Sequence, residues 1–202
     1  MTPGQPPRPA TNPAGVKRTR FGWKRTLLAG TLAMLLLCAA AWFVPRHGIE
    51  TQQVVRSGQV RSVLGNSVKA GPTGYVFTGA DGWDAFADLP SGEKIGVSGY
   101  QYRNGFQRRI LAAFMHPSRN SIAWDDPQHW TPPRDKAWGL PGGADLVGTM
   151  CGSGTCGRWL IWWPYRDSVF IVDYRPLDAV GTADAVAAMS PLLKGVREAL
   201  AS

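Results

Sequence analysis

The chain has no acidic residue ahead of Glu50, so its formal net charge of +8 is unevenly distributed. Most of that charge comes from six basic residues near the N-terminus, and the rest of the chain is close to neutral. Such a distribution does not indicate a folded nucleic-acid-binding surface, and we expect no nucleic-acid partner. It is typical of the cytoplasmic side of a membrane helix. The six residues are Arg8, Lys17, Arg18, Arg20, Lys24 and Arg25.

Charged residues are also absent from Thr26–Val44, a continuous apolar run. As a helix rising about 1.5 Å per residue, this run spans roughly the 30 Å hydrocarbon core of a bilayer. Trp23 and Trp42 lie near its ends, where amphipathic rings favour the headgroup level. We therefore predict a retained signal anchor over residues 23–45. A cleaved signal peptide is the alternative, because Ala39–Ala41 offers small residues, but the apolar run continues beyond them.

The charge distribution also predicts the orientation of this anchor. The basic N-terminus is expected in the cytoplasm, and the C-terminal part beyond the membrane. The protein would then be a single-pass protein of a bacterial inner membrane, with a periplasmic or otherwise extracytoplasmic domain. Residues 1–22 are rich in proline and poor in apolar side chains, which predicts a disordered cytoplasmic tail.

Residues 46–51 are read as a short stalk, and residues 52–202 have the length of one ordinary domain. Strand and helix patterns both occur there. They predict an α+β fold with an antiparallel sheet of hairpins and a meander, and a C-terminal helix packed on the sheet. The first part of this domain, residues 52–88, is expected to contain short strands and one helical turn. The strands are expected at residues 52–56, 59–64 and 74–77, and the turn at residues 80–88.

The clearest expected hairpin covers Lys94–Phe114, because Asn104-Gly105 is the favoured centre of a type I′ turn. Its register places Ile95 and Phe114 in the core at the base, and leaves the tip exposed. The tip combines aromatic and arginine side chains, which are enriched at binding hot spots. We predict a partner-binding patch there; an ordinary solvated hairpin is the alternative. The patch consists of Tyr100, Tyr102, Arg103, Phe106, Arg108 and Arg109.

The C-terminal third shows the strongest regular patterns. Strands are expected at residues 145–151, 157–163 and 169–174, as a meander whose central strand is buried on both faces. A helix is expected from Thr182, with Thr182 as its N-cap. Pro191 interrupts the helical pattern and predicts either a kink or two short helices. The apolar stripe consists of Val186, Met189, Leu193, Val196 and Leu200.

Regular periodicity is lacking between residues 116 and 143. Loops this long are uncommon unless functional or disordered, and the tryptophans argue against disorder. Acidic and histidine side chains between tryptophans could perform acid–base chemistry, and the tryptophans could stack on sugars. Capping of loop backbone by the aspartates, and burial of the tryptophans, are the alternatives. The possible ligand loop contains Trp124, Asp125, Asp126, His129, Trp130 and Trp138.

Cysteine is scarce, with three in the chain. Cys38 lies inside the apolar run, and Cys151 and Cys156 lie in the domain. Four residues separate this pair, whereas thioredoxin-type redox pairs have two, so we predict a structural disulfide. No histidine or third cysteine lies nearby in the sequence, and we expect no metal or other cofactor.

These features together predict a membrane-anchored, non-enzymatic protein of the cell envelope. No catalytic motif is evident, and the patch at Tyr100–Arg109 suggests that the extracytoplasmic domain binds a protein partner. Such a protein could be an accessory subunit of an envelope assembly, or a tethered inhibitor or immunity-type protein. The alternative is a cell-wall glycan-binding module or hydrolase that uses residues 116–143.

Overall fold

The computed structural model describes residues 30–40, 50–66, 68–73, 80–116, 129–130 and 138–202. The chain forms two compact units, Met1–Ala40 and Ala41–Ser202. In the first unit residues 30–40 are helical and exposed, and they belong to the apolar run. Within the described ranges, no helix is both long and apolar enough to span a membrane. The predicted anchor over residues 23–45 extends beyond these ranges, and the predicted tail over residues 1–22 lies outside them.

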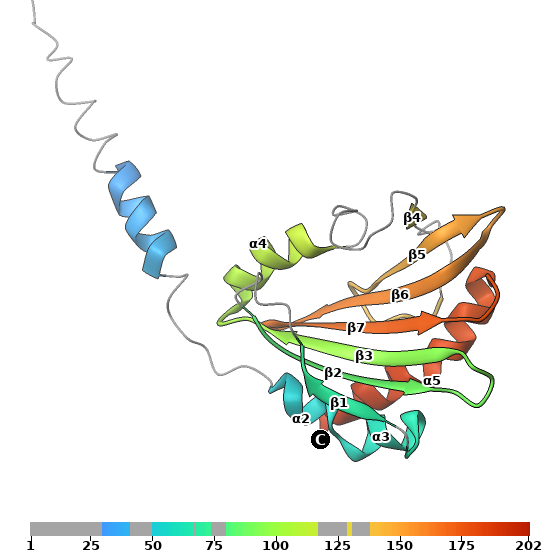
Figure 1. Ribbon diagram of the computed structural model, residues 1–202. Coiled ribbons are helices and arrows are strands. Elements are labelled where there is room, and N and C mark those ends of the chain that lie inside the picture. The colour runs from blue at the N-terminus through green and yellow to red at the C-terminus, as the bar shows by residue number, and fades with distance from the viewer. Residues whose placement is uncertain (1–29, 41–49, 67, 74–79, 117–128, 131–137) are drawn as a thin grey trace, which may run out of the picture. The chain divides into compact units, whose positions relative to one another are not determined.

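The second unit is an α+β domain built on one antiparallel sheet of seven strands, in the order β1-β2-β3-β7-β6-β5-β4 (Figure 1). This confirms the predicted antiparallel sheet with a C-terminal helix. The strands are β1 Lys69–Pro72, β2 Asp81–Asp88, β3 Lys94–Gln101, β4 His129–Trp130, β5 Asp145–Gly152, β6 Thr155–Tyr165 and β7 Ser168–Arg175. The helices are α2 Thr51–Val55, α3 Gly58–Leu64, α4 Gly105–Met115 and α5 Thr182–Ala201.

The predicted meander is confirmed as β5, β6 and β7. Side chains of a strand alternate between the two faces of the sheet, and both faces of β6 are buried. Trp159 and Ile161 face the core that contains α2, α3 and α5. Leu160 and Trp162 face a smaller cluster that contains residues of α4. A strand buried on both faces explains the nearly continuous apolar sequence of β6.

The first part of the domain differs from the prediction. Residues 52–56 and 59–64 lie mainly in helices, not strands, because their valines and Leu64 form one buried face against the sheet and α5. The hydroxyl of Ser57 caps α3 by accepting from the N–H of Val60 at 3.3 Å. Thr51, placed in the stalk, is a buried residue of α2. The predicted strand at residues 74–77 lies outside the described residues.

The predicted helical turn at residues 80–88 is also wrong, because this segment is strand β2. It pairs with β1 on one side and with β3 on the other. Trp83 and Phe86 therefore point to opposite faces of the sheet, whereas a helical turn would have placed them on one face.

The hairpin over Lys94–Phe114 is wrong in its second half. β3 forms as expected, but its two edges pair with β2 and β7, so no edge remains for residues 106–114. Asn104 is instead the N-cap of α4, and its side chain accepts from the N–H of Gln107 at 2.9 Å. Asn is favoured at an N-cap as well as in a type I′ turn, which explains the ambiguity. Ile95 is buried as predicted, whereas Phe114 is 69% exposed.

The C-terminal helix is continuous over Thr182–Ala201, with Pro191 inside it, so the prediction of two short helices is wrong. Gly181 is the N-cap, not Thr182. Met189 and Val196 of the predicted stripe are fully buried against the sheet. Packing of this apolar face outweighs the cost of a proline in the helix interior.

Candidate functional site

The predicted pair Cys151 and Cys156 forms a disulfide, with a Cα–Cα distance of 4.0 Å. The two residues oppose each other in β5 and β6, and Cys156 is fully buried. A Cβ atom at Gly148 would lie 2.5 Å from the Sγ of Cys156, so glycine leaves the space that the disulfide fills. This environment fits a structural crosslink between neighbouring strands.

The predicted patch is divided between the core and the surface. Tyr102 is only 3% exposed, and Tyr100 is half-buried beside the same cluster. Burial raises the pKa of Tyr102 to about 12. Arg108 is half-buried, and burial and the neighbouring Arg109 lower its pKa. Half of the patch therefore supports the fold instead of facing solvent.

The rest of the patch is exposed: Phe106 and Arg109 lie in α4, and Arg103 directly precedes its N-cap. Phe106, Ile110 and Phe114 follow one another at four-residue spacing, so they form one stripe. Their exposed fractions are 39%, 36% and 69%. Arg103 and Arg109 are exposed next to them, and no acidic residue occurs from residue 102 to residue 116. We call these five residues the α4 outer face.

Hydrophobic stripes on helices of soluble domains normally face the core. Gln107 and Ala112 are buried on the inner face of α4, and Leu111 and Met115 are partly buried against the smaller cluster. Phe106, Ile110 and Phe114 of the same helix are nevertheless exposed. Figure 1 shows α4 apart from α2, α3 and α5. The sequence assigned Phe114 to the core of a hairpin and so missed this stripe.

The possible ligand loop is described only in part. Trp124, Asp125 and Asp126 lie outside the described residues. His129 and Trp130 form strand β4, which pairs with Thr149 and Gly148 of β5. Trp138 is half-buried and packs against the main core. Among the described residues, no group of three or more His, Cys, Asp or Glu side chains could hold a metal ion.

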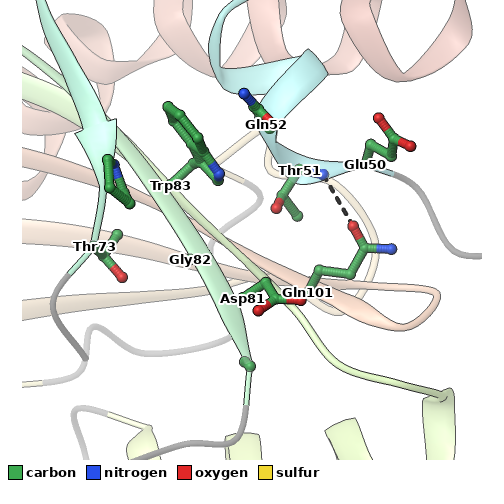
Figure 2. Close-up of a pocket in the computed structure, with 10 residues that line it drawn as sticks. Glu50, Thr51, Gln52, Thr73, Asp81, Gly82, Trp83 and Gln101 are labelled. Carbon is green, nitrogen blue, oxygen red and sulfur yellow. Dashed lines mark hydrogen bonds between the residues drawn. The ribbon is translucent and has the colours of Figure 1, made fainter. Parts of the chain in front are cut away.

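A polar cleft of about 700 Å³ lies where α2 meets the ends of β1, β2 and β3 (Figure 2). We call it the α2–β2 cleft. The sequence did not indicate it, because its parts come from four separate segments and Trp83 was assigned to a helical turn. Its lining residues are Glu50, Thr51, Gln52, Pro72, Thr73, Ala80, Asp81, Gly82, Trp83 and Gln101.

The comparisons with known proteins add little. No family model matches the sequence, and no curated protein matches it. Among solved structures, the extracellular domain of PknH from Mycobacterium tuberculosis is similar, with a TM-score of 0.40 and 10% sequence identity. The match covers 74% of this chain and 97% of that chain. A likeness at this score carries no argument about location or activity.

Proposed function

We propose that the protein is a membrane-anchored, non-enzymatic envelope protein whose extracytoplasmic domain binds a protein partner through the α4 outer face. The exposed stripe of Phe106, Ile110 and Phe114 is the observation that carries this proposal. Aromatic and arginine side chains contribute most to protein interfaces, and the α4 outer face combines both types. An accessory subunit and a tethered inhibitor or immunity-type protein are both consistent with it.

The chemistry of the α4 outer face specifies the partner surface. Three large apolar side chains need an apolar groove, and exposed Arg103 and Arg109 favour carboxylates at its border. No acidic side chain between residues 102 and 116 neutralises these arginines locally. The partner is therefore an extracytoplasmic protein with an apolar groove bordered by acidic residues.

Two observations support the extracytoplasmic location. The apolar run Thr26–Val44 follows a basic segment without acids. The disulfide between Cys151 and Cys156 belongs to an oxidising compartment, because disulfides are rare in reducing cytoplasm.

Site-specific photocrosslinking tests the partner. The full chain in native membranes would carry a photoreactive amino acid at Phe114, or at Leu177 as a control that is equally exposed at 69% but lies outside α4. We expect a discrete protein adduct from position 114 only. Replacing Arg103 and Arg109 by Glu should remove it without changing the melting temperature, because both side chains are exposed.

Three outcomes would contradict the proposal. They are the absence of any protein adduct, equal adducts from both positions, and adducts with lipid alone. The last would mean that the α4 outer face rests on the bilayer.

A further inference from the structure

The α2–β2 cleft is a second candidate binding site, and it shares no residue with the α4 outer face. Its volume of about 700 Å³ lies within the range of ligand-binding pockets. A ligand site in this cleft goes beyond the proposed partner binding and does not depend on it.

The base of the cleft is held by specific tertiary contacts. The N–H of Thr51, at the start of α2, donates to the Oε1 of Gln101 at 3.1 Å (Figure 2). Thr51 is only 2% exposed. A Cβ at Gly99 would lie 2.9 Å from the Cβ of Thr51, so glycine at that position lets α2 approach β3. The cleft is therefore part of how α2 docks on the sheet.

The charged groups of the cleft are hydrogen-bond acceptors. Glu50 and Asp81 supply carboxylates, and no basic side chain is among its lining residues. Glu50 accepts from the Nε2 of Gln53 at 2.6 Å, whereas Asp81 has no hydrogen-bond or ion-pair partner among the described residues. Like charge disfavours phosphates and carboxylates. The fitting ligand therefore donates hydrogen bonds and carries no negative charge.

An apolar wall lies beside these acceptors. Trp83 in β2 lies opposite Pro72 in β1, and both line the cleft. The guanidinium of Arg56 lies over one face of the Trp83 ring, 5.7 Å from its centroid, so a stacking ligand must use the other face. The negatively polarised face of an indole attracts the weakly positive C–H bonds of a flat apolar surface. An indole beside carboxylates and amides suits a ring with C–H bonds on its faces and hydroxyl groups at its edge.

We propose that the α2–β2 cleft binds a ring sugar that bears hydroxyl or amino groups and no acidic group. Trp83 stacks on the sugar ring, Asp81 accepts from its hydroxyl or amino groups, and the amides of Gln52 and Gln101 bind at the edge. A glycan of the cell wall and a free oligosaccharide share this chemistry.

Calorimetric titration of the full chain tests the proposal. A detergent with a non-sugar headgroup is essential, because a maltoside would itself compete for the cleft. The probes are cellotetraose as the neutral ligand, the chitosan tetramer as the amino ligand and tetragalacturonate as the acidic ligand. We expect saturable binding of the neutral or the amino probe, and at least tenfold weaker binding of the acidic one.

Two variants connect binding to the cleft. Asp81→Asn changes an exposed carboxylate without changing its size, and it should weaken binding by about tenfold, the loss expected for one charge-assisted hydrogen bond. Trp83→Leu should abolish binding; because Trp83 also contacts the core, a melting curve must confirm that this variant folds. Asp88→Asn is the matched control, since it lies on the same strand and outside the cleft.

The affinities of the three probes and the variants either support or contradict the sugar site. Binding that is weakened about tenfold in Asp81→Asn and unchanged in Asp88→Asn supports the sugar site. The proposal fails if no probe binds, if the acidic probe binds as tightly as the others, or if Asp81→Asn leaves affinity unchanged. Replacing residues of the α4 outer face should not alter sugar binding, so failure of one proposal is distinguishable from failure of the other.

Discussion

At the residue scale, Asp173 shows how the sheet accommodates buried charge. Its side chain accepts from the Nε and Nη2 of Arg158 at 3.0 and 2.7 Å, and from the Nη2 of Arg175 at 3.0 Å. Asp173 is 3% exposed, so its removal leaves the largely buried guanidinium of Arg158 without this carboxylate. We expect Asp173→Ala to lower the free energy of unfolding by about 3–5 kcal/mol in urea denaturation.

A surface ion pair provides the comparison for Asp173. Asp88 and Lys94 lie 3.6 Å apart, with both side chains more than 60% exposed. Asp88→Ala should lower the free energy of unfolding by less than about 1 kcal/mol, because water and salt screen such pairs. Equal costs for the two substitutions would show that the pair of Asp173 and Arg158 is not buried as described.

Tyr174 and Glu93 form a pH-dependent contact between β7 and the turn before β3. The hydroxyl of Tyr174 donates to Glu93 at 2.6 Å. This bond lowers the pKa of Glu93 from 4.5, while burial, followed by the same bond, raises the pKa of Tyr174 to about 12. Because the pKa of Glu93 is lowered on folding, its carboxylate stabilises the fold above pH 4.5. This stabilisation is lost as the pH falls through the pKa of Glu93 in the folded protein. Because the pKa of Tyr174 is raised on folding, its neutral hydroxyl stabilises the fold below pH 10. This stabilisation is lost as the pH rises towards 12.

We therefore expect Tyr174→Phe to lower the free energy of unfolding by about 1 kcal/mol at neutral pH. The loss is smaller than for a fully buried hydrogen bond to a charged group, because Glu93 is partly exposed. The difference from the unaltered protein should shrink below pH 4.5 and as pH rises towards 12, measured by denaturation across pH. Tyr165→Phe is the control, because the hydroxyl of Tyr165 has no hydrogen-bond partner among the described residues. A difference that does not vary with pH would contradict this explanation.

At the element scale, the decisive segment is the Asn104-Gly105 dipeptide at the start of α4. In a type I′ turn, Gly105 would need a positive φ, and alanine there would be strained. In α4 its φ is not positive, and a Cβ would meet only the backbone oxygen of Arg166 at 3.7 Å. Gly105→Ala should therefore leave thermal stability unchanged or raise it by up to about 1 kcal/mol.

Gly92 provides the matched control for Gly105. It lies between β2 and β3 with a φ of 90°, which alanine rarely adopts. Gly92→Ala should lower the melting temperature. If Gly105→Ala were as destabilising as Gly92→Ala, the hairpin would be favoured over the helix.

At the scale of the whole molecule, the charge distribution predicts topology. We expect an alkaline phosphatase fused after Ser202 to be active in cells, because the six basic residues before the apolar run should hold the N-terminus in the cytoplasm. A reporter that is active only in the cytoplasm should be inactive at the same position. The opposite pattern would overturn the predicted orientation.

The sequence alone determined the elements whose residue pattern allowed only one structural interpretation. The alternating and continuous apolar residues of β5, β6 and β7 had no competing helical interpretation, so their bounds were nearly correct. The apolar stripe of the C-terminal helix was equally clear. The disulfide followed from the spacing of Cys151 and Cys156, because cysteines at opposite positions of two adjacent strands bring their Cα atoms close together.

Tertiary structure decided the segments whose local signals were ambiguous. Short valine-rich sequences around Val54 and Val60 suit strands, but burial against the sheet and α5 selects helices. Asn104 suits both a turn and an N-cap, and pairing of both β3 edges excludes the hairpin. The α4 outer face and the α2–β2 cleft join residues whose proximity or exposure depends on that pairing. Sequence periodicity reports which residues share a face of an element, and only packing decides which face meets solvent.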